Sequence, residues 1–206
     1  MEQNPKNSHP ALLTIICPMK NEEKNLAAFF ARLVPVLESV ADAYEILCIN
    51  DGSQDNTLAY LLKEKEINPN IKIADLSRNF GKEAALTCGI ELAKGDVVIP
   101  IDADLQHPPE TIIEMINCWQ KGYEVVLARR QNRKSEGWIR RRTAGWFYKL
   151  QNKISEVHIP ADVGDFRLMD RKVIEALKKL PERRRFMKGL FAWVGFRQTT
   201  ITFICE

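Results

Sequence analysis

The chain has 206 residues, of which 45% are hydrophobic, and this length and composition predict a single domain with one buried core. It contains no run of about 18 apolar residues, the length that a membrane span needs, and the polar N-terminal tail 1–11 lacks the apolar core of a signal peptide. The five cysteines are scattered without a C-x-x-C pair, so neither a zinc site nor a disulfide framework is implied, and free thiols are predicted, with Cys17 and Cys48 buried.

The net charge of +3 divides unevenly along the chain. Residues 1–128 carry 11 Lys/Arg and 19 Asp/Glu, a net charge of −8, whereas residues 129–206 carry 19 Lys/Arg and 8 Asp/Glu, a net charge of +11. Solvated helix faces explain many of the lysines, but they explain less well the arginine runs at 129–130, 140–142 and 183–185. The division predicts a cation site beside a surface for anions or anionic lipid. The acidic first part and the lack of a recognised motif argue against a nucleic-acid-binding protein.

The first 128 residues alternate between short β-branched runs and helical patterns. Strands are predicted at 12–17, 45–49, 71–76, 97–101 and 124–127, and helices at 22–40, 55–66, 82–93 and 110–120. Pro35 is expected to kink or divide the first of these helices. The alternation predicts an α/β fold with a mostly parallel sheet and helices on both faces.

After residue 128 the alternation weakens. A loop at 131–137 precedes a basic helical pattern at 138–154, which carries Trp138, Trp146 and Tyr148. This aromatic and basic segment suits a membrane interface or a mobile acceptor lid, or it packs its aromatic rings into the core. A strand is predicted at 166–169, helices at 173–180 and 183–192, and an apolar strand-like run ends the chain.

Two aspartates follow the predicted strand 97–101. Asp102 and Asp104 stand two positions apart, and Pro108 and Pro109 then open a helical pattern. Hard oxygen ligands at the end of a buried strand suit a divalent cation shared with phosphates. The alternative is a solvated turn. The metal interpretation is strengthened because polar residues also follow the other predicted strands, at the same edge of the sheet.

Two of these polar segments fit a nucleotide. Asp51 follows the second strand within a tight turn, where Ser53 or Asp55 can cap the next helix and Asp51 can bind a base or ribose. Arg78 and Lys82 precede the third helix, where they can neutralise a diphosphate or belong to a plain loop. There is no Walker sequence.

Hydrolytic chemistry finds little support. There is no G-x-S-x-G or H-E-x-x-H sequence, and the three histidines are interpreted as surface residues rather than bases. His107 alone stands beside the predicted metal site.

Taken together, four segments resemble the inverting family 2 glycosyltransferases of GT-A fold. They are Pro18-x-x-Asn21-Glu22, Asp51-Gly52-Ser53-x-Asp55-x-Thr57, the segment 78–85 and the segment 102–109. Segments 162–168 and 180–197 further resemble the polyprenyl-phosphate hexosyltransferases, a branch that includes bactoprenol glucosyltransferases and dolichol-phosphate mannose synthases. The resemblance runs from about residue 12 to residue 198.

The resemblance implies a GT-A catalytic domain over 12–206, with a nucleotide-sugar and metal-binding part at 12–128 and a basic acceptor and membrane-facing part at 129–206. It implies transfer of glucose from UDP-glucose to a polyprenyl phosphate at the cytoplasmic face of an anionic membrane. The implied ligands of Mg²⁺ or Mn²⁺ are Asp102, Asp104 and Gln106. The implied donor-binding residues are Pro18, Asn21, Glu22, Asp51, Ser53, Arg78, Lys82 and Asp102. The implied acceptor-phosphate residues are Arg129, Arg141, Arg142, Arg183 and Arg185, and the catalytic set is Asp102, Asp104, Gln106, Arg129 and Asp165.

Two departures from the family pattern are expected to matter. Asn50 stands where relatives commonly have an aspartate, so one donor contact is neutral here. Relatives of the bactoprenol type continue into two membrane helices, which this chain lacks, so it is interpreted as a truncated catalytic domain. A sugar-nucleotide-binding protein without chemistry, a non-lipid acceptor and a homo-oligomer remain open alternatives.

Overall fold

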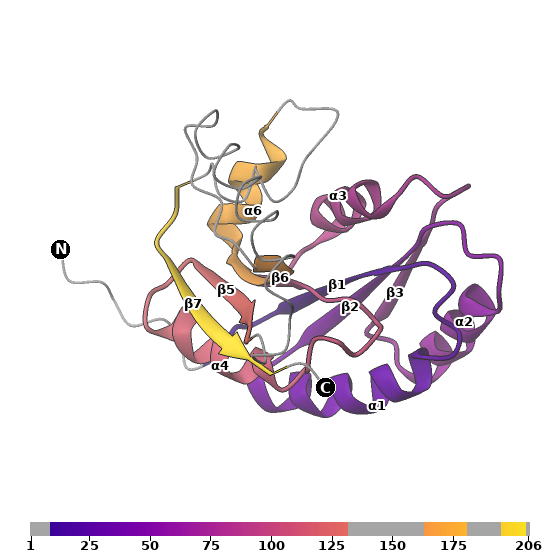
Figure 1. Ribbon diagram of the computed structural model, residues 1–206, viewed down its shortest axis with the longest axis horizontal. Coiled ribbons are helices and arrows are strands. Elements are labelled where there is room, and N and C mark those ends of the chain that lie inside the picture. The colour runs from indigo at the N-terminus through magenta and orange to yellow at the C-terminus, as the bar shows by residue number, and fades with distance from the viewer. Residues whose placement is uncertain (1–8, 132–162, 181–194, 205–206) are drawn as a thin grey trace, which may run out of the picture.

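The computed structural model describes residues 9–131, 163–180 and 195–204. In these ranges the strands are β1 Leu13–Met19, β2 Tyr44–Asn50, β3 Ile71–Asp75, β4 Val97–Pro100, β5 Val125–Arg130, β6 Val163–Asp170 and β7 Gln198–Phe203. The helices are α1 Leu26–Val40, α2 Thr57–Ile67, α3 Lys82–Leu92, α4 Thr111–Gln120 and α6 Arg171–Lys178 (Figure 1). Each strand and helix predicted within these ranges is present, with ends that differ by a few residues.

The seven described strands form one sheet in the order β3-β2-β1-β4-β6-β5-β7. The pairs β1–β2, β2–β3, β1–β4 and β5–β7 are parallel, which confirms the mostly parallel sheet. The strand β6 runs antiparallel to both of its neighbours, β4 and β5. Its amino end therefore lies at the sheet edge where the other strands have their carboxyl ends.

Helices cover both faces of the sheet, as predicted. The helices α1, α2 and α4 lie on one face, and α3 and α6 lie on the other (Figure 1). Phe29, Leu33 and Leu37 of α1 are fully buried in the first layer. In the second layer α3 approaches the sheet closely at Gly89, where an added Cβ would lie 2.3 Å from Cγ2 of Ile16. These layers leave the carboxyl ends of the parallel strands as the exposed polar edge.

The helix α1 differs from its prediction in two ways. It begins at Leu26 rather than at residue 22, because residues 22–25 form a turn that is closed by the Asn25 N–H donating to the Glu22 carbonyl at 2.8 Å. Pro35 lies inside α1 and does not divide it. Pro35 is exposed, so water can satisfy the helix carbonyl that its missing N–H leaves open.

The prediction of buried free thiols is confirmed for Cys17 and Cys48, which face each other across β1 and β2. Burial raises the pKa of both thiols, so they are neutral and unreactive at neutral pH. Cys88 and Cys118 are also free thiols but only partly buried, and Cys205 lies outside the described residues. No helix in the described ranges is long and apolar enough to cross a membrane.

Candidate active site

The strand order reverses beside β1. The strands β2 and β3 lie on one side of β1 and β4 lies on the other, so the boundary between β1 and β4 is a topological switch point. Ligands of open α/β sheets bind outside the carboxyl ends of the strands at such a point. The predicted polar residues after β1, β2 and β4 gather there.

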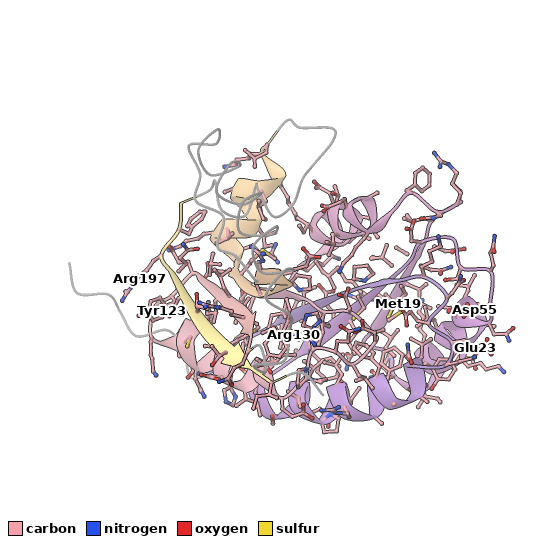
Figure 2. All side chains as sticks on the ribbon, in the orientation of Figure 1. Met19, Glu23, Asp55, Tyr123, Arg130 and Arg197 are labelled. Carbon is pink, nitrogen blue, oxygen red and sulfur yellow. The ribbon has the colours of Figure 1, made fainter. Side chains whose placement is uncertain are left out.

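A pocket of about 270 Å³ opens at this point. It is lined by Pro18, Met19, Lys20, Glu22, Asp51, Asn79, Gly81, Lys82, Ala85, Asp102 and Asp104. Of the predicted donor-binding residues, Pro18, Glu22, Asp51, Lys82 and Asp102 line this pocket, whereas Asn21, Ser53 and Arg78 do not. Met19, labelled in Figure 2, is the last residue of β1.

Lys82 joins two carboxylates at one side of the pocket. Its ammonium lies 2.7 Å from one oxygen of Asp102 and 2.8 Å from the other, and 3.0 Å from Oδ2 of Asp165. Partial burial by itself lowers the pKa of Lys82, but the negative charges of Asp102 and Asp165 outweigh it and raise the pKa. Lys82 is therefore protonated at neutral pH and acts as a fixed positive charge in the site.

Asp104 takes a different position from Asp102. Its side chain is exposed, and its Oδ1 accepts a 3.0 Å hydrogen bond from the backbone N–H of Gln106. Leu105 between them has a φ of 59°, in the left-handed region. The turn therefore holds Asp104 and Gln106 next to each other, and the hydrogen bond uses only Oδ1 of Asp104.

The residues at this edge suit a divalent cation held jointly by the protein and a phosphate. No group of three or more His, Cys, Asp or Glu side chains within 9–131, 163–180 and 195–204 is arranged to hold a metal ion. Mg²⁺ is usually bound by one or two carboxylates together with substrate phosphates, and Asp102 and Asp104 supply that number. The Lys82 ammonium, which pairs with Asp102, already places one positive charge against this carboxylate.

Asp51 lines the pocket and is buried. Its two oxygens accept hydrogen bonds from the backbone N–H groups of Phe80 at 2.7 Å and Gly81 at 2.9 Å. A carboxylate has about four acceptor positions, so Asp51 keeps acceptor capacity toward a ligand. It holds the loop before α3 over the site.

Asn50 precedes Asp51 and is also buried. Its amide donates to Oδ1 of Asp75 at 2.7 Å and its carbonyl accepts from the backbone N–H of Ser53 at 3.3 Å. An amide, unlike an aspartate, can donate to a neighbouring carboxylate. The neutral residue at position 50 therefore matches its partner on β3.

The loops after β1 and β2 are bound to each other. The Asn21 N–H donates to Ser53 Oγ at 3.0 Å, and the Asn21 side chain accepts from the Gln54 N–H at 2.8 Å. The Glu23 N–H donates to Asp55 at 3.2 Å, and both residues lie at the edge of the molecule in Figure 2. Asn21 and Ser53 thus brace the wall of the pocket.

Asp55 also binds the start of α2, as predicted from its place in the turn. Its Oδ1 accepts from the backbone N–H of Thr57 at 3.0 Å and from the Thr57 hydroxyl at 2.6 Å. That hydroxyl in turn accepts from the Glu22 N–H at 2.9 Å. One motif therefore fixes both a helix start and the loop that carries Glu22.

Glu22 increases the negative charge of the pocket. Burial raises the pKa of this carboxyl, and the nearby Asp104, Asp102 and Asp55 raise it further, against a 2.7 Å hydrogen bond from the Asn25 side chain. Burial is the larger cause of this shift, and repulsion from the neighbouring carboxylates adds to it. Such a site favours binding of a cation.

Asp165 reaches the site from the amino end of β6. Sequence reasoning looks for site residues only after the carboxyl ends of strands, so it does not expect this position on an antiparallel strand. Its Oδ2 binds Lys82, and its buried Oδ1 has no hydrogen-bond partner among the described residues.

Arg167, two residues further on, is buried, and burial lowers its pKa to about 10, while Asp165 opposes the shift. Its guanidinium donates to the Gly164 carbonyl at 2.6 Å. Sequence reasoning gives no role to Arg167, because a charged residue within a predicted strand is normally expected on the face toward solvent. The structure instead buries it next to Asp165.

His107, expected at the surface, is half-buried. Its ring lies 5.0 Å from that of Phe166 and 5.5 Å from that of Phe203, so it joins the loop after β4 to β6 and β7. Its Nδ1 lies 3.9 Å from Asp102. Burial lowers the pKa of His107, against the attraction of Asp102 and Asp104. The ring is therefore neutral at neutral pH and packs beside the predicted metal ligand.

Of the predicted acceptor-phosphate residues, only Arg129 falls within the described part of the chain. It is exposed on β5, which extends to Arg130 rather than ending at residue 127. Arg141, Arg142, Arg183 and Arg185 lie outside the described residues, as do Trp138, Trp146, Tyr148 and the predicted helices 138–154 and 183–192. Arg197, which precedes β7, stacks on the ring of Tyr123, with its guanidinium carbon 4.7 Å from the ring centre (Figure 2).

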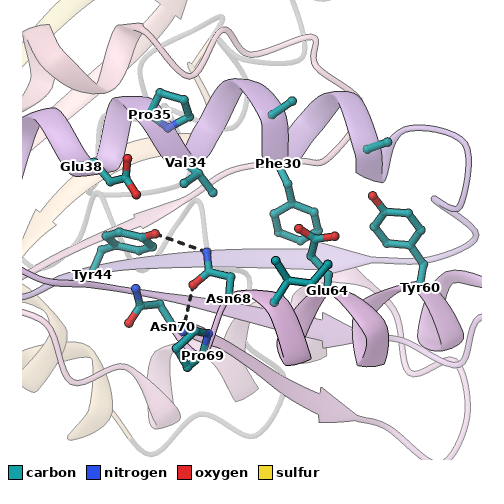
Figure 3. A pocket seen from close by; sticks show the side chains of 13 residues that line it. Phe30, Val34, Pro35, Glu38, Tyr44, Tyr60, Glu64, Asn68, Pro69 and Asn70 are labelled. Carbon is teal, nitrogen blue, oxygen red and sulfur yellow. Dashed lines mark hydrogen bonds between the residues drawn. The ribbon is translucent and has the colours of Figure 1, made fainter.

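A second hollow, of about 570 Å³, lies between α1 and α2 (Figure 3). Phe30, Pro35 and Tyr60 are among its lining residues, and the Asn68 amide donates to the Tyr44 hydroxyl at 3.3 Å across it. It contains none of the predicted site residues. The chemistry-bearing side chains are gathered in the smaller pocket.

The sheet covered by helices on both faces, with a carboxylate-lined pocket at its switch point, has the architecture of a GT-A domain. The family description "Glycosyl transferase family 2" matches residues 14–178, and the chain belongs to this family. The predicted fold class and family are confirmed.

Curated relatives extend the comparison. The chain is 56% identical over 191 residues to an uncharacterized glycosyltransferase, sll0501, of Synechocystis sp., covering 93% of this chain and 60% of the relative. It is 44% identical over 192 residues to the bactoprenol glucosyl transferase of Shigella phage SfV, covering 93% of this chain and 62% of that protein. The chain thus spans about three fifths of the length of the curated relatives it matches.

Solved structures share the fold at low identity. The mannosyltransferase PcManGT from Pyrobaculum calidifontis, in complex with GDP-Man and Mn²⁺, has a TM-score of 0.64 at 16% identity, with 97% of this chain and 57% of that chain covered. Glucosyl-3-phosphoglycerate synthase from Mycobacterium tuberculosis, in complex with UDP, has a TM-score of 0.61 at 16% identity, with 96% and 71% covered. These likenesses establish the GT-A fold.

Proposed function

We propose that this domain is an inverting hexosyltransferase that moves glucose from UDP-glucose to a polyprenyl phosphate. The acceptor class is supported by relatives named bactoprenol glucosyl transferase at 43–44% identity. One structural observation carries the proposal: Lys82 and the carboxylates of Glu22, Asp51, Asp102 and Asp104 converge on one pocket at the switch point of the sheet.

In this proposal the pocket binds the donor. Asp102, Asp104 and Gln106 would hold Mg²⁺ or Mn²⁺, and the bound cation would supply positive charge to offset that of the diphosphate. Lys82, with Arg78, adds positive charge beside the diphosphate. Pro18 and Asp51 bind the nucleoside portion, and Asn21 and Ser53 keep the pocket wall in place through their mutual hydrogen bond.

The reaction needs no protein base. An oxygen of the acceptor phosphate forms a bond to the anomeric carbon while the bond to the diphosphate breaks, and the nucleoside diphosphate leaves with the electron pair. A phosphate monoester with a second pKa of about 6 is already largely ionised at neutral pH. Asp165 orients the ammonium of Lys82, which it binds at 3.0 Å. Catalysis comes mainly from positioning and electrostatics.

The acceptor binds on the basic side. Arg129, Arg141, Arg142, Arg183 and Arg185 pair with the acceptor phosphate, since guanidinium groups bind phosphate oxygens in bidentate geometry. The net charge of +11 in residues 129–206 favours an anionic membrane surface at the cytoplasmic face.

The test is a transfer assay with UDP-glucose, polyprenyl phosphate and Mn²⁺, with the glycolipid product measured by mass spectrometry. Asp104→Asn is expected to lower turnover at least about a hundredfold, the loss expected when an electrostatic group of the site is removed. Asp42→Asn makes the same chemical change at an exposed position away from the pocket and is expected to retain turnover. Full turnover by Asp104→Asn, or transfer to a soluble acceptor but not to the lipid, would contradict the proposal.

A further inference from the structure

The contact between Lys82 and Asp102 bears on how a divalent cation reaches the site. The Lys82 ammonium lies within 2.8 Å of both oxygens of the Asp102 carboxylate, so it sits directly in front of that carboxylate. A metal ion bound to Asp102 must approach the same oxygens at about 2.0–2.6 Å. The ammonium and a divalent cation therefore compete for one position.

Lys82 has a second anchor and room to move. Its ammonium also binds Asp165 at 3.0 Å, so it can leave Asp102 without losing every partner. Its side chain is 43% exposed and stands at the first residue of α3, beside the pocket. A four-carbon lysine stem can carry its charge from a carboxylate to a nearby phosphate with little change in the backbone.

Resting on the proposed donor site, we infer that Lys82 is a resident cation that blocks Asp102 until a nucleotide diphosphate draws it away, so that the divalent metal and the nucleotide bind as a pair. The diphosphate supplies the ammonium with a new anionic partner. It also supplies the oxygen ligands that Asp102 and Asp104 alone do not provide.

This arrangement predicts coupling between the two ligands. If the diphosphate frees Asp102, it raises the affinity for the metal, and by linkage the metal raises the affinity for the diphosphate by the same factor. Removing the ammonium opens Asp102 to the metal at all times. The coupling then shrinks, because the diphosphate no longer has a cation to displace.

The test is titration of the whole chain with MnCl₂, followed by electron paramagnetic resonance of free Mn²⁺, with and without saturating UDP. Wild type is expected to bind Mn²⁺ weakly alone and at least about tenfold more tightly with UDP, within the usual range of coupling factors. Lys82→Met is expected to bind Mn²⁺ alone about tenfold more tightly than wild type and to show a coupling factor reduced at least about fivefold.

Two further variants separate charge from other effects. Lys82→Arg keeps a positive charge beside Asp102 and is expected to keep Mn²⁺ binding weak in the absence of UDP. Lys63→Met removes one positive charge from an exposed position on α2 and is expected to behave as wild type. Circular dichroism melting checks that each variant is folded.

Failure of the Lys82 displacement and failure of the donor site give different results in this titration. Mn²⁺ binding to folded Lys82→Met no tighter than to wild type overturns the inference, including the case in which Mn²⁺ does not bind to that variant. If UDP fails to bind wild type with or without Mn²⁺, the proposed donor site fails instead. Tight Mn²⁺ binding by Lys82→Met together with normal UDP coupling would also contradict the displacement of Lys82.

Discussion

The Asp51 carboxylate accepts a 2.9 Å hydrogen bond from the backbone N–H of Gly81, thirty residues further along the chain. With a second bond from the Phe80 N–H, it fixes the loop that leads into α3 and carries Lys82 to the pocket. A residue of the predicted donor-binding motif therefore also holds the backbone of a loop that lines the pocket.

Asp51→Asn tests this role. An asparagine has one acceptor oxygen, so one of the two hydrogen bonds is lost. Loss of the bond from the Phe80 N–H costs about 1–3 kcal/mol of unfolding free energy, whereas the Gly81 N–H also donates to Oδ1 of Asn79 at 3.0 Å and keeps that partner. Amide hydrogen exchange measured by NMR is expected to accelerate at Phe80 or Gly81 and to stay unchanged in β1. Asp42→Asn serves as the control, and unchanged exchange in the loop would refute the assignment.

Gly52 offers a second test of the same loop contact. Its φ is 63°, and an added Cβ would lie 2.5 Å from the backbone C of Arg78 and the backbone N of Asn79. Gly52→Ala must both adopt an unfavourable conformation, at about 1–3 kcal/mol, and push the loop away. Gly81→Ala is the comparison variant: its φ of 95° and ψ of 157° also lie in a region that favours glycine, but nothing lies within 4 Å of an added Cβ, so it reports backbone strain without a clash.

Urea unfolding is the measurement for this pair. Gly52→Ala is expected to lower the unfolding free energy by more than Gly81→Ala does. Equal losses would mean that the close approach of Arg78 and Asn79 to Gly52 does not matter for stability.

The sequence predicts the parallel core of this fold well because each strand–helix–strand crossover leaves a local signature. The switch point follows less directly, but the polar residues after the strands at 12–17, 45–49 and 97–101 still indicate the correct sheet edge. Pocket residues such as Asp102 and Asp104 are accessible to this reasoning because they follow buried runs immediately.

The position of β6 is not accessible in that way. It pairs with β4 across some seventy residues and runs antiparallel, and hydrophobic periodicity carries neither the partner nor the direction of a strand. The contact between Asp165 and Lys82 depends on that pairing. Hydrogen bonds such as that between Asn21 and Ser53 are equally hidden, because a motif does not reveal whether its polar groups face a ligand or one another.

Glu45 gives the fold a dependence on pH that is separate from the site. Its side chain accepts hydrogen bonds from the Thr14 hydroxyl at 2.6 Å and the Lys94 N–H at 2.9 Å, and it pairs with Lys72. Burial by itself raises the pKa of Glu45, but these partners outweigh it and hold the pKa below its ordinary value of 4.5. The ionised carboxylate therefore stabilises the folded state.

Glu45→Gln is expected to lower the unfolding free energy at pH 7 by about 1–3 kcal/mol, the usual contribution of hydrogen bonds to a charged group. Because the folded pKa is depressed, this contribution is fully present above pH 4.5 and disappears as the pH falls through the folded pKa. The difference in melting temperature between wild type and variant should thus narrow below pH 4.5. A constant difference from pH 7 to pH 3 would show that packing, rather than charge, dominates.

Asp170 connects two helices on opposite faces of the sheet. Its removal should therefore lower the unfolding free energy by more than the removal of an ordinary exposed helix cap does. Its Oδ1 accepts from the Lys172 N–H at the start of α6 at 3.1 Å, and its Oδ2 accepts from Nε1 of Trp119 in α4 at 2.8 Å. Asp170→Ala removes both acceptors, for an expected loss of about 2–4 kcal/mol from the lost cap and the buried indole N–H together. Asp170→Ser restores only the cap and should recover about 1 kcal/mol of this loss in urea unfolding. Equal stability of the alanine and serine variants would mean that the cap of α6 contributes nothing and that the bond to Trp119 carries the whole effect.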